Sequence, residues 1–351
     1  MTAPAWNVIG QAEASARLQA AIGAGRIGHA YLITGPDGVG KTTFALEFAR
    51  ALMCLERADG SACGQCDSCR RISRDRERRS HPDLTLADVE WQATLLGSRA
   101  GAARQRLSIE AVRWLRQDIV SRPILSRWKV QIVDEADLLS EAAPDAFLKT
   151  LEEPPASAVI MLVASSLEAV PETIRSRCQH VQLGLAPKST LVAELTARGV
   201  TETQAAAIAA VARGRVATAL ELAAQPEALE RWRADVAEAF ACLSEPLARV
   251  RLAGPLAANH TKDRERTFTL LDHCAGLWRD ALIVQAGLVD NLAYPHMRER
   301  LAAFAGELGP EQIARALRAT RRAAHDLERN FQARIALLAM INLWPDLPER
   351  P

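Results

Sequence analysis

The sequence predicts an α/β fold with a parallel sheet, followed by a C-terminal part that is entirely helical. Between Ala30 and Leu183, short apolar runs alternate with helical patterns, which is typical of a parallel sheet with helices on both faces. After Pro187 these runs stop, and alanine, leucine and arginine predominate. We therefore expect an α/β domain over residues 1–185, a small helical lid over 186–240 and a helical domain over 241–351.

Four segments are predicted to be strands of this sheet. They cover residues 31–34, 128–133, 159–164 and 180–183. The middle two are rich in β-branched residues, and no charge interrupts their later halves, as expected for buried strands. A short helix is predicted between them at 145–153 and ends before Pro154 and Pro155, because proline lacks the N–H donor and clashes with the preceding turn.

Helices are predicted where apolar residues recur three and four positions apart. The first covers residues 42–55 and follows a glycine-rich loop. Thr201 and Gln204 form a pattern typical of a helix start, and Gly214 is a plausible helix end. The other predicted helices cover residues 228–243, 264–286, 310–327 and 330–343.

Composition limits the class of protein. With 351 residues, of which 49% are apolar and 24% charged, the chain is long enough for two or three globular domains. Its net charge of +1 gives no bulk electrostatic reason for tight, unaided binding to nucleic acid. The N-terminus lacks a signal-peptide pattern, and no apolar run approaches the roughly 18 residues of a membrane span. We expect a cytoplasmic protein with reduced cysteines.

The glycine-rich loop reads GPDGVGKT and matches G-x-x-x-x-G-K-[ST] at all four fixed positions. In this pattern backbone N–H groups surround phosphates, the lysine neutralises their charge and the hydroxyl binds Mg²⁺. A nucleotide with Mg²⁺ is therefore the expected ligand. The predicted binding residues are Gly35, Gly38, Val39, Gly40, Lys41, Thr42, Thr43 and Asp134.

Polar residues end the two central strands. Asp134 is placed to hold Mg²⁺, and Glu135 to orient or deprotonate an attacking water. Ser165 and Ser166 end the next strand, and Ser166 is our candidate for a hydroxyl near the γ-phosphate, although a serine pair alone is more typical of a simple strand end.

A cysteine cluster follows the helix at 42–55. Cys54, Cys63, Cys66 and Cys69 are separated by eight, two and two residues. Four thiolates suit tetrahedral Zn²⁺ in a closed structural site, so we predict a zinc knuckle over residues 54–69. The alternative is a reduced loop that packs without metal. His81 is not needed as a ligand, because four cysteines complete the coordination shell.

Arg177 lies in the segment Ser176-Arg177-Cys178, after a turn at Pro171. A single arginine at a domain edge is normally a surface or salt-bridge residue. It acquires a catalytic role only if a neighbouring subunit's nucleotide lies against it, because a guanidinium supplied in trans stabilises charge on the transferring phosphate.

Together these residues resemble the AAA+ subunits of the bacterial DNA polymerase III clamp loader. The matching segments are 29–43, the four cysteines, 81–84, 134–136, 148–155 and 174–178. The resemblance covers roughly residues 7–183 and implies ATP as the nucleotide, Arg177 acting in trans, and helical lid and collar domains. It also implies partners, namely the gamma/tau and delta subunits, the sliding clamp and, through the assembly, primed DNA.

Two members of this family fit the sequence, the delta-prime subunit and the gamma/tau motor subunit. The segments HPDL and IRSRCQ and the chain end near residue 350 are similar to delta-prime. Motor subunits carry an arginine in the lid that senses the γ-phosphate. Ala217 occupies that place here, and we expect Arg215, two residues away, to point elsewhere. We therefore expect a delta-prime-like subunit, with a gamma/tau-type ATPase as the alternative.

Two other classes of protein are alternatives. The letters DEAD at 134–137 suggest a helicase, but such enzymes need a second set of buried strands, which the sequence lacks after Pro187. The other is a zinc-bearing scaffold or nucleic-acid adaptor with a vestigial nucleotide pocket, which a nucleotide titration distinguishes from the clamp-loader hypothesis.

Overall fold

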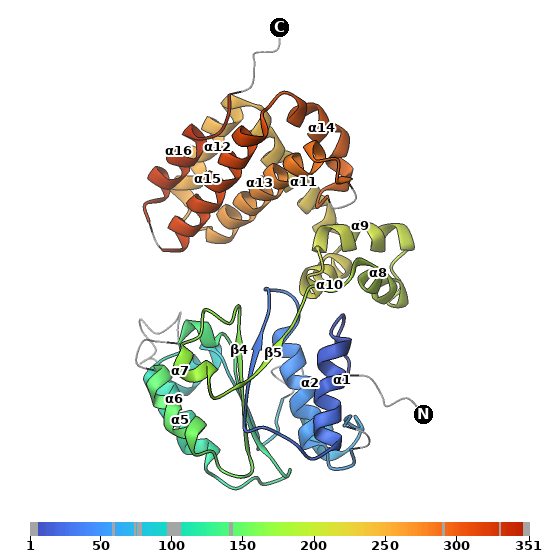
Figure 1. Ribbon diagram of the computed structural model, residues 1–351, viewed down its shortest axis with the longest axis vertical. Coiled ribbons are helices and arrows are strands. Elements are labelled where there is room, and N and C mark those ends of the chain that lie inside the picture. The colour runs from blue at the N-terminus through green and yellow to red at the C-terminus, as the bar shows by residue number, and fades with distance from the viewer. Residues whose placement is uncertain are drawn as a thin grey trace. The chain divides into compact units, whose positions relative to one another are not determined.

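The computed structural model describes residues 6–57, 60–73, 75, 79–96, 107–139, 143–289, 292–329 and 331–346. The chain divides into two compact units, the first being Met1–Gly199 with Gly214–Thr218 and the second Val200–Arg213 with Ala219–Pro351. Figure 1 shows the α/β part and the helical part. None of the described helices combines the length and the apolar character that crossing a bilayer requires.

The first unit is built on a parallel sheet of five strands in the order β2-β3-β4-β1-β5. The strands are β1 (Ala30–Thr34), β2 (Leu84–Ala87), β3 (Lys129–Val133), β4 (Ala158–Ala164) and β5 (Gln179–Gln182). Every residue of β1, β3 and β4 is buried. The apolar character of these runs follows from this, because strands covered on both faces have no solvent side.

Helices cover both faces of the sheet (Figure 1). On one face Tyr31 and Ile33 pack against α2 (Lys41–Met53), near α1 (Ala12–Gly23). The Tyr31 and Phe48 rings meet edge to face at 4.8 Å. On the other face Leu32 and its neighbours pack against α5 (Ile109–Ile119), α6 (Ala143–Glu152) and α7 (Glu172–Arg175). Shorter elements complete the unit: α3 (Asp67–Arg71), α4 (Val89–Leu96), η3 (Ala136–Leu138) and α8 (Lys188–Ala197).

The described residues of the second unit form helices and no strand. These elements are α9 (Glu202–Ala212), α10 (Val216–Ala224, shared with the first unit), α11 (Pro226–Ser244), α12 (Pro246–Asn259), α13 (Arg264–Gln285), η5 (Pro295–Met297), α14 (Arg298–Gly306), α15 (Pro310–Glu328) and α16 (Ala333–Asn342). Trp278 of α13 is fully buried and meets Trp344 at 5.6 Å. The second parallel sheet that a helicase requires is therefore not found in this part of the described chain.

The predicted α/β fold and the four predicted strands are confirmed. Thr201 caps α9, its hydroxyl oxygen accepting the N–H of Gln204 at 3.4 Å. The predicted boundary at 240–241 falls inside α11, and Val236 and Phe240 belong to the same apolar core as α13. Helix α11 and this apolar core therefore continue across residue 240, and the assignment of separate lid and collar domains stays a prediction.

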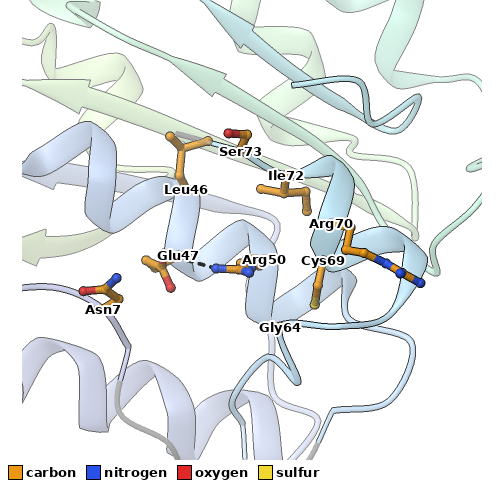
Figure 2. A pocket seen from close by; sticks show the side chains of 9 residues that line it. All are labelled: Asn7, Leu46, Glu47, Arg50, Gly64, Cys69, Arg70, Ile72 and Ser73. Carbon is orange, nitrogen blue, oxygen red and sulfur yellow. Dashed lines mark ion pairs between the residues drawn. The ribbon is translucent and has the colours of Figure 1, made fainter. Parts of the chain in front are cut away.

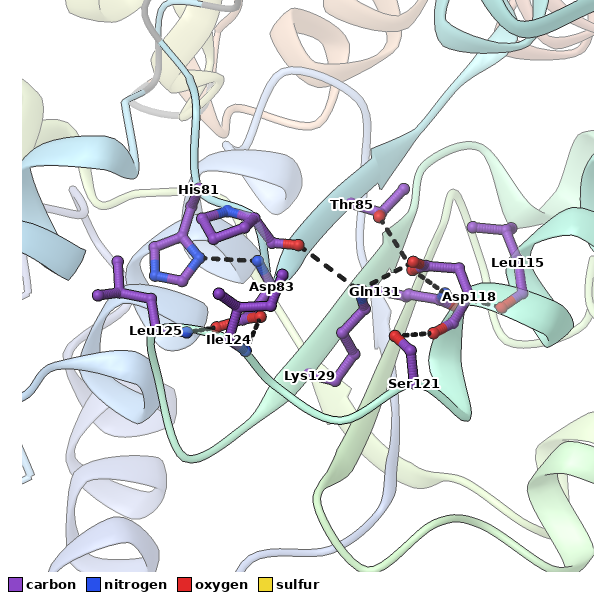
Figure 3. A network of polar contacts seen from close by, with 11 residues as sticks. His81, Asp83, Thr85, Leu115, Asp118, Ser121, Ile124, Leu125, Lys129 and Gln131 are labelled. Atoms are coloured by element: carbon purple, nitrogen blue, oxygen red, sulfur yellow. Dashed lines mark hydrogen bonds and ion pairs between the residues drawn. The ribbon is translucent and has the colours of Figure 1, made fainter.

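Strand β2 was not predicted, and a buried carboxylate holds the segment before it (Figure 3). Asp83 is fully buried and accepts three backbone N–H groups, from Ile124 at 2.6 Å and from Leu125 and Ser126 at 2.8 Å. Burial raises the pKa of Asp83, but these donors and His81 outweigh it, so the pKa lies below its usual value. Asp83 thus fixes the loop that leads into β3.

A second buried group joins β3 to α5 in the same view. Lys129 and Asp118 form an ion pair at 2.8 Å, and the Gln131 amide donates to Asp118 at 3.1 Å (Figure 3). Lys129 and Gln131 are buried within β3, so their polar groups need these partners inside the protein. These contacts explain how a strand with a charged first residue remains buried.

We expect Asp83→Asn to lower the free energy of unfolding by about 2–4 kcal/mol, because an amide replaces one acceptor oxygen with a donor that faces other donors. Urea unfolding at pH 7 measures this loss. Asp145→Asn, at an exposed acidic residue, is the control and should change stability little.

The same variant has a defined pH dependence. Since the folded pKa of Asp83 is lowered, its stabilisation is complete above the unfolded value near pH 4 and is lost as the pH falls through the folded pKa. The difference between wild type and Asp83→Asn should therefore shrink in acid. A difference that is absent at pH 7, or independent of pH, contradicts this assignment.

Candidate nucleotide-binding site

The parallel sheet gathers the predicted site residues at one edge. The glycine-rich loop follows β1, Asp134 follows β3 and Ser165 follows β4. These three strands are neighbours and run in the same direction. Their carboxyl ends therefore open on one edge, the usual position of ligand sites in such sheets.

Two glycines shape the loop. Gly35 approaches the next segment so closely that a Cβ atom there would lie 2.5 Å from the carbonyl oxygen of Leu183. Gly40 has φ +90° and immediately precedes α2, a left-handed conformation that side chains rarely adopt. The N–H groups that begin α2 thus follow directly on the loop, in the arrangement that favours phosphate. Val39 is buried in the core and anchors the loop.

Lys41 is held by the loop itself. Its ammonium group donates to the carbonyl oxygen of Gly35 at 2.9 Å and to the carboxylate of Asp37 at 3.0 Å. Asp37 is almost fully exposed, so this ion pair contributes little to stability. A phosphate group would therefore compete with an exposed carboxylate for the lysine.

Thr42 and Asp134 lie in direct contact. The threonine hydroxyl donates to the Asp134 carboxylate at 2.8 Å, joining residues that are 92 positions apart. In phosphate-loop proteins these two residue types hold Mg²⁺. Burial raises the pKa of Asp134, and the hydrogen bond from Thr42 opposes this rise. The structure thus brings together the two predicted magnesium residues.

Glu135 is exposed beside them, in the left-handed conformation with φ +51°. Partial desolvation of the carboxylate and the neighbouring carboxylates of Asp134, Asp137 and Asp88 raise its pKa. A group whose pKa is raised in this way is a better proton acceptor than an ordinary carboxylate once it is ionised. Its position next to Asp134 suits the predicted role, which is to orient or deprotonate an attacking water.

The serines have other partners. Ser165 hydrogen bonds to Asp137 through its hydroxyl and, at 3.1 Å, through its backbone N–H. The Ser166 oxygen accepts the N–H of Ala169 at 3.3 Å and so caps the turn after β4. The predicted role of Ser166 near a γ-phosphate stays a prediction.

Arg177 belongs to a separate group of side chains, formed by α6 and α7. Its guanidinium donates to the Glu152 carboxylate at 2.5 Å and to the carbonyl oxygen of Thr173 at 2.8 Å. The arginine side chain is 34% exposed and that of Glu152 50% exposed. The pair is accessible, so another anion can replace Glu152 without unfolding this region.

The four cysteines form a compact cluster. All four sulfur atoms lie within 4.8 Å of one another, with Cys54 to Cys66 at 3.9 Å and Cys63 to Cys69 at 4.0 Å. Backbone N–H groups point at the sulfurs, as from Cys66 to Cys63 at 3.3 Å. Burial raises the pKa of Cys66, but N–H donors from Cys69 and Leu55 and the neighbouring thiols lower it to about 6. This thiol therefore ionises more readily than that of an ordinary cysteine.

His81 supports the cluster from outside. Its Nδ1 accepts the N–H of Asp83 at 3.1 Å, so Nε2 carries the proton and faces the Ser68 oxygen at 2.9 Å. The Ser68 hydroxyl in turn donates to the carbonyl oxygen of Met53 at 2.8 Å. This series of hydrogen bonds links α3 to α2 and to the segment before β2.

A pocket of about 420 Å³ lies beside the cluster (Figure 2). Glu47 and Arg50 of α2 face each other across 3.8 Å in this pocket, and Cys69 and Arg70 of α3 line it from the other side. Because acidic and basic groups are both present, its lining selects no particular charge.

Two residues near the loop were not predicted from the sequence. Asp88 follows the unpredicted strand β2 and caps α4, accepting the N–H of Trp91 at 2.7 Å. Asp37 pairs with Lys41. The expectation that Arg215 points elsewhere is wrong, because its side chain lies against Gly38. Arg215 precedes α10, which starts at Val216, so helical spacing does not apply to it.

Known proteins resemble the α/β part of the chain. The family model described as DNA polymerase III, delta subunit, matches residues 10–186. The DNA polymerase III subunit gamma/tau of Mycobacterium tuberculosis is 36% identical over 189 residues, covering 54% of this chain and 30% of that protein. The subunit tau of Escherichia coli is 34% identical over 177 residues, covering 50% of this chain and 25% of that protein.

The match thus spans less than a third of the length of these two relatives. Among solved structures, a DNA polymerase III gamma subunit-related protein from Thermotoga maritima covers 90% of this chain and 93% of its own, with 18% identity and a TM-score of 0.42. A likeness this distant does not bear on function. The family model covers half of the chain, from Gly10 just before α1 to Ala186 after β5, and so includes all five strands and the phosphate loop. On this evidence the chain belongs to the DNA polymerase III delta subunit family.

Proposed function

We propose that this chain is a delta-prime-like subunit of the DNA polymerase III clamp loader. In this role it assists the ATP-dependent loading of the sliding clamp onto primed DNA, together with gamma/tau and delta subunits. It holds a nucleotide in its own phosphate loop and presents Arg177 to the ATP of a neighbouring subunit. The family match and the accessible Arg177–Glu152 pair support this proposal.

The observation that carries the choice of delta-prime is the residue at position 217. Ala217 reaches the phosphate loop through its backbone, donating its N–H to the carbonyl oxygen of Gly38 at 2.8 Å. Its methyl side chain brings no charge to the loop. Because position 217 lacks the arginine that senses the γ-phosphate in motor subunits, the lid supports nucleotide binding more than rapid hydrolysis.

A gamma/tau-type motor is the second candidate. The relatives compared above are gamma/tau and tau subunits, and Lys41, Thr42, Asp134 and Glu135 are all present. These are the groups that a phosphate-loop ATPase uses. Hydrolysis by the purified chain decides between the two candidates.

The cysteine cluster fits a zinc ion. With Zn–S bonds of about 2.3 Å, tetrahedral geometry places sulfur atoms about 3.8 Å apart. The distances of 3.9 and 4.0 Å are close to this value. Cys54, Cys63, Cys66 and Cys69 would hold the ion, which would serve to fix the loop between α2 and α3.

The purified chain should bind Mg-ATP saturably and hydrolyse it little. Lys41→Ala should weaken binding by about 10- to 100-fold, since a charge-assisted hydrogen bond to phosphate is lost. A fluorescent-nucleotide titration and a phosphate-release assay measure the two properties, with the exposed Lys188→Ala as control. Robust turnover by the lone chain would favour the motor, and no saturable binding would favour the vestigial pocket.

Arg177→Ala should lower the DNA-stimulated ATPase of an assembly reconstituted with gamma/tau, delta and clamp. An arginine supplied in trans contributes about 10³-fold or more at the site that it faces. Co-purification shows that the variant still assembles. Arg198→Ala, at an exposed arginine paired within α8, should leave the rate unchanged. Full ATPase activity in an intact Arg177→Ala assembly rules out the trans role.

Elemental analysis of the purified chain should find about one zinc per molecule, as expected for a site with four cysteine ligands. Cys66→Ser should lower this content and the melting temperature, because one ligand of the loop is lost. Cys178→Ser is the matched control, as this half-buried cysteine lies outside the cluster. Equal zinc in wild type and Cys66→Ser contradicts the assignment.

A further inference from the structure

Residues 214–218 are held by the phosphate loop and by the segment that follows β5. Gly214 has φ +82°, and its carbonyl oxygen accepts the N–H of Ala186 at 2.9 Å. A Cβ atom at Gly214 would lie 2.7 Å from the Leu185 side chain, so no larger residue fits there without movement. Three residues later, Ala217 donates its N–H to Gly38 at 2.8 Å. These two bonds determine where the side chain between them is placed.

That side chain is Arg215, and its stem lies on the loop. The Cβ, Cγ and Cδ atoms of Arg215 are 3.2–3.5 Å from the position that a Cβ atom on Gly38 would occupy. Gly38 itself has φ +80° and carries no side chain, so nothing separates the arginine stem from the loop backbone. The arginine is half-buried as a result.

The guanidinium of Arg215 has no hydrogen-bond or ion-pair partner among the side chains that the structure describes. Lys41 differs, because Asp37 and two loop carbonyls already hold its ammonium group. A half-buried guanidinium without a protein partner favours an anion, and its planar fork suits two phosphate oxygens at once. The loop beneath it is built to surround phosphates.

We propose that Arg215 binds the phosphate groups of the nucleotide held by this loop. The assignment rests on the proposed nucleotide binding and adds a residue to that site. Lys41 and Arg215 then approach the phosphates from different segments, one from the start of α2 and the other from the residue before α10. The lid thereby contacts nucleotide although position 217 is alanine.

The test measures affinity and needs no hydrolysis. Arg215→Met keeps a stem of similar length and removes the charge, so packing on Gly38 is largely preserved. We expect the affinity of the full-length chain for Mg-ATP and Mg-ADP to fall on the order of tenfold in a fluorescent-nucleotide titration. Arg215→Lys should lose less affinity than Arg215→Met. Arg198→Met is the control and should bind as wild type does.

Thermal unfolding with and without Mg-ADP gives a second readout. Arg215→Met should melt near wild type without nucleotide and gain less stability when nucleotide is added. If Arg215→Met and wild type bind equally, Arg215 only packs on the loop and the assignment is overturned. If neither wild type nor any variant binds saturably, the nucleotide site itself fails, and Arg215 fails with it.

Discussion

The site depends on the parallel pairing of β1, β3 and β4. Their register aligns Thr34 with Ala164 and Val133 with Leu162, so the three carboxyl ends stop at nearly the same level of the sheet. As a result, Thr42, just after the loop that follows β1, can donate a hydrogen bond to Asp134, which follows β3. A shift of one residue in β3 would turn its apolar side chains to the opposite face and move Asp134 out of reach. Core packing and site geometry are therefore set by the same register.

The features that could be predicted from the sequence are those that depend on residues close together in the chain. The phosphate loop, the helix after it and the central strands follow from local pattern, as do the cysteine spacing and the Thr201 cap. Contacts between distant segments were missed. β2 is only four residues long and is held by Asp83, whose three donors lie more than forty residues further on in the chain. α12 contains Gly254 and Pro255, which weaken a helical pattern locally, so only packing in the helical unit explains it.

The two arginines illustrate the same difference. Arg177 was selected from a motif, and the structure adds that Glu152 holds it on the surface. Such an exposed ion pair contributes little to stability, so Glu152 orients Arg177 and another anion can still replace it. Arg215 was set aside because helical spacing turned it away from the loop. Its contact with Gly38 depends on Gly214, whose left-handed backbone no helical pattern describes. The proposed phosphate contact of Arg215 therefore depends on the turn at Gly214, and not on its position in a helix.

The charges around the loop explain why nucleotide and metal belong together there. Loss of contact with water raises the pKa of both Asp134 and Glu135, Asp88 adds to the rise at both, and Asp134 adds to the rise at Glu135. At neutral pH their ionised forms therefore cost stability, because a carboxylate with a raised folded pKa is destabilising once the pH exceeds its unfolded value. A divalent cation held by Thr42 and Asp134 would relieve this repulsion, whereas phosphate alone would increase it. In the proposed complex, Lys41 and Arg215 offset the phosphate charge. The charges around the loop therefore favour an anion that is accompanied by a divalent cation, as in the proposed magnesium nucleotide.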